Sequence, residues 1–104
     1  MSKINIVYKL PGMMPVNMAI EDELEYYQTL VNGYIEVFDL YTFPDTVIIC
    51  NEEGKLKGMK YNCTIENEHL VGPIIFVGFN DEGDFVDCPR SIEEILMIMH
   101  DWGC

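Results

Sequence analysis

Apolar and polar residues alternate along the first part of the chain. Ile4, Ile6 and Tyr8 occupy every second position, which is the period of a β-strand. Pro11-Gly12 breaks this pattern, and alternation resumes over residues 16–20. The sequence therefore predicts two strands, the second returning against the first.

A helix is predicted next. Asp22 and Glu25 have the spacing of a capping box, and acidic residues in a first turn suit the helix dipole. Spacings of four, three and four residues give one apolar stripe, made of Ile20, Leu24, Tyr27 and Val31. Asn32-Gly33 is a typical C-terminal stop.

The middle of the chain predicts two more strands. Residues 34–39 alternate, Phe43-Pro44-Asp45 turns the chain, and residues 46–50 form a continuous apolar run rich in β-branched residues. Such a run is typical of a central strand covered on both faces. Turns are predicted over residues 52–55 and 57–58. Residues 60–68 are polar and read as irregular, with room for a short edge strand.

The last third of the chain predicts a buried strand, a hairpin and a helix. Residues 72–80 contain the strand, which meets Phe85-Val86 across a turn over residues 80–84. Ser91 and Glu94 form a capping box, and an apolar stripe follows, made of Ile92, Ile95, Leu96 and Met99. The fold predicted for residues 1–104 is a single α+β domain: a mostly antiparallel β-sheet with two helices packed on it.

One stretch of the chain carries a family resemblance. Its residues are Gly33-Tyr34-Ile35-Glu36-Val37, then Val47-Ile48-Ile49-Cys50-Asn51-Glu52-Glu53-Gly54-Lys55-Leu56, then Gly58 and Asn62. The chain, from Ile4 to the last helix, resembles the family called domain of unknown function 3846. The resemblance implies an origin in a phage or a mobile element of Gram-positive bacteria, and it transfers no catalytic or binding residues. The loop over residues 41–45 is bulkier than the family pattern.

The charge of the chain restricts its partners. Eighteen acidic residues against six basic ones give a formal net charge of -12. This balance argues against direct binding of nucleic acid and against an anionic membrane surface, because both require clustered lysine and arginine. It favours a basic partner. The chain shows no signal-peptide pattern and no apolar run long enough to span a bilayer, so we expect a cytoplasmic protein with reduced cysteines.

The carboxylates occur in groups, of which two are the candidate interaction surface: Glu21, Asp22, Glu23 and Glu25, and Asp81, Glu82 and Asp84. Smaller groups are Glu52 with Glu53 and Glu66 with Glu68. One interpretation is a negative field that imitates nucleic acid and occupies a partner's basic groove. The other is a solvated surface that keeps a small protein in solution.

Exposed aromatic residues form a second candidate surface. Tyr26, Tyr41 and Phe43 fall on predicted outer faces or loops, where aromatic residues can serve an interface, including one between two copies of the chain. Anchoring of loops is the alternative. The turn around Asp81-Glu82-Gly83-Asp84 lacks the ligand spacing of a calcium loop, and a hairpin-tip glycine explains it better.

No metal, cofactor or catalytic site is predicted. Cys50, Cys63, Cys88 and Cys104 contain no Cys-x-x-Cys pair, and His69 has only Glu66 and Glu68 as nearby carboxylates. Cys50 reads as a core residue. Cys88, beside Arg90 and close to the last helix, is a candidate for a lowered pKa, with a structural role as the alternative.

These observations predict a non-catalytic binding protein and not an enzyme. Its expected partner is a host protein with a basic surface, and the expected role is inhibition of a nucleic-acid-handling or defence protein. A nucleotide-like small molecule is the alternative ligand, for which the clustered cations are Lys55, Lys57, Lys60 and Arg90. An accessory subunit without inhibitory role is a third interpretation.

Overall fold

The strands of the protein form two antiparallel sheets in the computed structural model, which describes residues 3–101. Sheet A contains β1 (Lys3–Lys9), β2 (Val16–Glu21), β3 (Ile35–Asp39), β4 (Thr46–Asn51), β7 (Ile74–Phe79) and β8 (Phe85–Val86). Sheet B contains β5 (Tyr61–Ile65), β6 (Glu68–Val71) and β9 (Met99–His100). The helices are α1 (Leu24–Val31) and α2 (Ile92–Met97). The predicted α+β class, with mostly antiparallel strands, is confirmed.

Sheet A has the strand order β2-β1-β7-β4-β3, with β8 paired to β7. All six residues of β4 are buried, because β4 lies between two strands and the sheet is covered on both faces. The prediction of a central strand from its continuous apolar run is therefore confirmed. The hairpin of β1 and β2 and that of β7 and β8 also have the predicted pairing.

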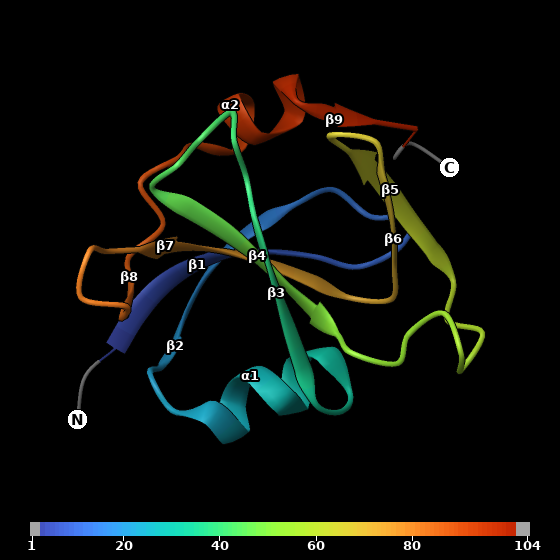
Figure 1. Cartoon of the computed structure of the whole chain (residues 1–104), viewed down its shortest axis with the longest axis horizontal. Helices are drawn as coiled ribbons and strands as arrows, with labels where there is room; N and C mark the ends of the chain where they lie inside the picture. Colours follow the sequence, from blue (N-terminus) through green and yellow to red (C-terminus); the bar gives the residue numbers. More distant parts are fainter. Residues whose placement is uncertain (1–2, 102–104) are drawn as a thin grey trace.

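Each face of sheet A packs on its own core. Tyr27 and Val31 of α1 contact one face, together with Ile49 and Val77 of the sheet. The other face packs on sheet B and α2, through a cluster of Ile48, Cys50, Phe76, Cys63, Leu70 and Ile95. Consistent with this, the two helices lie on opposite sides of the β-structure (Figure 1). The alternation of β-strands separates these two sets of side chains.

The predicted start of α1 was wrong. Glu23, and not Asp22, is the N-cap, and no side chain makes a capping hydrogen bond. Asp22 instead accepts a hydrogen bond from the Tyr27 hydroxyl at 2.9 Å. Of the predicted stripe, Ile20, Tyr27 and Val31 are buried, although Ile20 lies in β2, whereas Leu24 is 57 % exposed. The predicted stop is confirmed, since Asn32 has left-handed backbone torsions.

The start of α2 is as predicted, but its end is not. The Ser91 hydroxyl accepts a hydrogen bond from the Glu94 backbone N–H, and the Glu94 carboxylate accepts one from the Ser91 backbone N–H, so the capping box is present. The helix ends after Met97, and Met99 lies in β9, paired with Ile65. Its side chain still reaches the core, which explains why it fitted the helical stripe.

The prediction of an irregular segment over residues 60–68 was wrong, because this segment begins sheet B. β5 is the middle strand of that sheet and has three buried residues. Its Asn62 joins the two sheets: the side-chain oxygen accepts from Nζ of the fully buried Lys9 at 2.9 Å. The amide nitrogen of Asn62 donates to the carbonyl oxygens of Lys9 and Gly72. Because the segment contains polar residues such as Asn62, its sequence did not indicate a buried strand.

Candidate functional site

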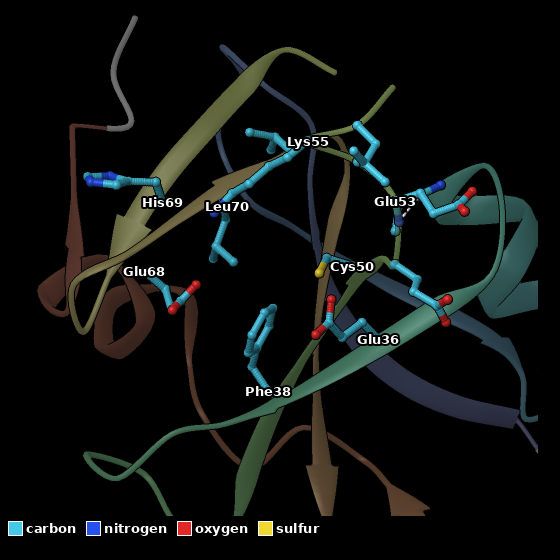
Figure 2. A pocket seen from close by; sticks show the side chains of 13 residues that line it. Glu36, Phe38, Cys50, Glu53, Lys55, Glu68, His69 and Leu70 are labelled. Carbon is cyan, nitrogen blue, oxygen red and sulfur yellow. Dashed lines mark hydrogen bonds between the residues drawn. The ribbon is translucent and has the colours of Figure 1, made fainter. Parts of the chain in front are cut away.

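A cavity of about 300 Å³ opens where the edge of sheet A meets sheet B. β3 and the end of β4 form one wall, β6 forms the other, and the loop after β4 closes one end (Figure 2). We call this cavity the groove; its lining residues are Glu36, Phe38, residues 50–56 and residues 68–71. Its volume is at the lower end of the range of ligand pockets.

The floor of the groove is apolar and belongs to the core. Cys50 and Leu70 are almost fully buried, at 6 % and 3 % exposure, and Phe38 is half-buried against the same core. Strand pairing explains this arrangement. Glu36 lies opposite Cys50, and Phe38 opposite Ile48, so both β3 side chains lie on the face of sheet A that meets sheet B.

The rim of the groove is acidic. Glu36, Glu52, Glu53 and Glu68 carry four negative charges, and Lys55 carries the one positive charge, a formal sum of -3 with His69 neutral. Figure 2 shows the Glu36 and Glu68 carboxylates on opposite walls, with the Phe38 ring between them and Cys50 beside Glu36. Burial, followed by these two carboxylates, raises the pKa of the Cys50 thiol to about 11, against the opposing effect of Lys55. The groove therefore has a local negative potential.

Asn51 fixes the loop that closes the groove. Its amide nitrogen donates to the carbonyl oxygens of Val31 and Asn32 at 3.0 and 3.1 Å, and its side-chain oxygen accepts from the Glu53 N–H at 2.7 Å. A Cβ atom on Gly33 would lie 2.7 Å from the Asn51 amide nitrogen, so this close approach requires glycine. The loop that closes the groove is thus tied to the end of α1.

The acidic residues predicted as an interaction surface lie elsewhere, at what we call the acidic end: Glu21, Asp22, Glu23, Glu25, Asp81, Glu82 and Asp84. Tyr27 brings the two groups together, because its hydroxyl donates to Asp22 and its ring lies 5.1 Å from that of Phe85 in the β7–β8 hairpin. Gly83, at φ +84°, is in the turn of that hairpin, as the hairpin interpretation predicted.

The four cations proposed for an anion site do not converge. Lys55 lines the groove, Lys57 pairs with Glu53 at 3.9 Å, and Lys60 is exposed outside the groove lining. Arg90 is on another part of the surface, where its guanidinium binds both oxygens of Asp45, at 3.2 and 2.5 Å. It also binds Glu94 at 3.2 Å. Arg90 therefore makes its ion pairs within the protein.

Of the three predicted exposed aromatic residues, two are open to solvent. Tyr26 is 45 % and Tyr41 is 76 % exposed, whereas Phe43 is half-buried beneath the Arg90 guanidinium, 4.5 Å from its ring centroid. Tyr26 lies on α1 and Tyr41 in the loop before β4. Neither lines the groove.

The remaining candidate residues have structural contacts. Glu66 accepts from the backbone N–H groups of Tyr41 and Thr42, and His69 shares a hydrogen bond with Thr64 at 2.9 Å. The lowered pKa considered for Cys88 was wrong, since burial raises the pKa of this thiol more than the nearby Arg90 lowers it. No group of three or more potential metal ligands occurs within residues 3–101.

Sequence reasoning missed the groove itself. Glu36 was assigned only to a strand, and Glu68 only to a minor acidic group. The signal that was present is the alternation that places Glu36 and Phe38 on one face of β3. That face became a site only because sheet B, which was not predicted, lies against it.

Comparison with family models matches residues 4–100 to the family described as Domain of unknown function (DUF3846). The chain belongs to the DUF3846 family. The matched region includes every residue that lines the groove. Comparison with curated proteins and with solved structures gave no match. Within the part of the chain that the structure describes, neither helix has the length and apolar character needed to cross a membrane.

Proposed function

We propose that this member of the DUF3846 family is a non-catalytic binding protein whose groove engages a positively charged segment of a partner protein. One observation carries this proposal: a concave site combines an apolar floor of Phe38, Cys50 and Leu70 with carboxylates on both walls. This combination suits a side chain that has an apolar stem and a cationic end.

Physical reasons favour a cation in the groove. A concave surface lined by one sign of charge concentrates the field more than a convex surface does. The half-buried ring of Phe38 adds a face that attracts cations, and an aliphatic stem can pack on Leu70 and Cys50. Lysine and arginine side chains satisfy both requirements.

The finer part of the proposal concerns the partner. Proteins that bind nucleic acid have basic surfaces, because they neutralise phosphates. The net charge of -12 would attract such a surface over a distance. Together with the phage or mobile-element context implied by the family resemblance, this supports a host nucleic-acid-handling or defence protein as the target. Occupation of its basic surface would inhibit it.

Other functions receive less support from the geometry. A nucleotide-like ligand needs cations around its phosphates, and of the four candidate cations only Lys55 lines the groove. An accessory subunit would use the same contact without inhibition. A small organic cation also fits the charge of the groove. The affinity capture described next distinguishes this ligand from a protein partner.

The test compares three tagged proteins in affinity capture from a lysate of the Gram-positive host at low salt. They are the wild type, the groove variant Glu36→Gln/Glu68→Gln, and the control variant Asp39→Asn/Glu93→Gln. The control removes the same amount of charge from two exposed residues that do not line the groove.

We expect a partner that elutes with increasing salt from the wild type and the control but is lost from the groove variant. Equal recovery by all three proteins would contradict a role for the groove. Recovery of no partner by the wild type would contradict a protein target and leave the small organic cation as the ligand.

A further inference from the structure

We propose that the free edge of β6 pairs with an extended strand of the partner, and that this strand places an arginine or lysine side chain in the groove. The inference rests on the proposed function and specifies how the partner segment is held. Three points support this pairing: β6 has an edge without a strand partner, the side chains of a paired strand would point alternately into the groove, and charge favours a basic segment.

The lining of the groove shows that the edge of β6 is available. A strand that presents one face to a cavity contributes every second residue, as β3 does with Glu36 and Phe38. β6 contributes Glu68, His69, Leu70 and Val71, which are consecutive and make up the whole strand. The groove therefore runs along the strand's edge. Within residues 3–101, β6 pairs with β5 on its other edge and has no second strand partner.

The direction of the side chains follows from the geometry of a strand. A segment paired with β6 would extend sheet B into the groove, and its side chains would point alternately toward sheet A and toward solvent. The inward side chain meets Phe38, with Glu36 on one side and Glu68 on the other (Figure 2). Main-chain hydrogen bonds would supply affinity, and the carboxylates would select the cation.

Charge selects a basic segment over a second copy of the chain. Each copy has a net charge of -12, and the groove carries a formal charge of -3. A second β6 edge would bring another Glu68 against these carboxylates. The edge is also only four residues long, or roughly 13 Å, so hydrogen bonds alone give a weak contact that depends on the charged side chain.

The test uses blocked nine-residue peptides of alternating valine and arginine, with binding measured by calorimetry at low salt. Two further peptides carry N-methyl groups on alternate backbone amides, one on the valines and one on the arginines. Because alternate residues direct their backbone groups to the same side, only one of these peptides loses the bonds to β6. An analogue with glutamate in place of arginine tests the charge.

We expect one N-methylated peptide to bind at least tenfold more weakly than the other, and the glutamate analogue not to bind. The Glu36→Gln/Glu68→Gln variant should lose tenfold or more in affinity for the arginine peptide, whereas Asp39→Asn/Glu93→Gln should change it less than twofold. Within residues 68–71, hydrogen exchange should slow at the backbone amides that point away from β5.

Equal binding of the two N-methylated peptides would overturn pairing with the edge while leaving a cation-binding groove intact. Slower exchange at β2 or β3, and not at β6, would overturn the choice of edge. Absence of binding by any arginine peptide would overturn the inference as a whole. The lysate experiment tests the proposed function separately, because a folded basic surface could still be captured there.

Discussion

The groove and the acidic end are both rich in carboxylates, but they differ in what lies beneath the charge. In the groove, Glu36 and Glu68 stand above a floor of core side chains. At the acidic end, the depression beside α1 is lined by Glu23, Glu25, Tyr26 and Thr29, all exposed and all from the helix or its N-cap.

This difference is the reason why we propose the groove, and not the acidic end, as the binding site. Three aromatic residues near the acidic end pack on one another: Phe85 contacts both Tyr27 and Phe79. Exposed carboxylates there are screened by water and salt. In the groove, the half-buried ring of Phe38 stays accessible between the two sheets, so a ligand can gain both apolar contact and charge.

The largest effect that tests this comparison is expected at Tyr27. Tyr27→Ala removes a side chain that is 1 % exposed and should lower the free energy of unfolding by about 3–5 kcal/mol. Binding of the arginine peptide by the protein that remains folded should be unchanged. Urea denaturation followed by calorimetry measures both quantities.

Tyr26→Ala is the matched control, because Tyr26 is the neighbouring residue and is 45 % exposed. It should change stability by less than about 0.5 kcal/mol. A weaker peptide affinity in Tyr26→Ala would mean that the acidic end takes part in binding, and the contrast between the two regions would fail.

A smaller loss of stability is expected at Asn51, together with an effect on the groove. Asn51→Ala removes two hydrogen bonds to the end of α1 and one within the loop, which should cost about 2 kcal/mol. Affinity for the arginine peptide should fall about threefold or more, since the loop containing Glu52 and Glu53 is no longer held in place. Asn17→Ala, at an exposed residue of β2, is the control. Unchanged affinity in Asn51→Ala would show that this loop does not contribute to peptide binding.

The smallest effect is expected on the alkylation rate of the Cys50 thiol, which depends on the electrostatic potential inside the groove. Its pKa of about 11 means that alkylation at pH 8 should be roughly 100-fold slower than for an ordinary thiol, and faster as the pH rises. Glu36→Gln/Glu68→Gln lowers this pKa and should increase the rate about two- to threefold. Mass mapping of the peptide containing Cys50 measures the rate. A rate unaffected by these substitutions would contradict a negative potential in the groove.

Much of the fold was predictable because its signals are local. Alternation identified β1 and β2, the apolar run identified β4, and Ser91 with Glu94 identified the start of α2. The failures lie where a hydrogen-bond or ion-pair partner gives a residue a role that differs from the predicted one. Asp22 looked like a cap but binds Tyr27, and Arg90 looked available but binds Asp45. Asp45 is 45 positions from Arg90, and Tyr27 belongs to the predicted helix, where it was expected only as part of the apolar stripe.

Sheet B is the clearest example of this limit. Asn62 gives its strand a polar appearance, yet the residue is 2 % exposed because its hydrogen bonds to Lys9 and Gly72 are made inside the protein. A sequence pattern shows that a side chain is polar, but not that a partner from another strand will satisfy it.

The sequence by itself determined the fold class, most of the strands of sheet A and the excess of negative charge, because these depend on composition and local periodicity. Only the tertiary structure decided which of these charges line a groove. Glu36 and Glu68 are 32 positions apart, and they line one groove because sheet B packs on one face of sheet A with β6 as its edge strand. That juxtaposition depends on packing between distant segments, which no local pattern encodes.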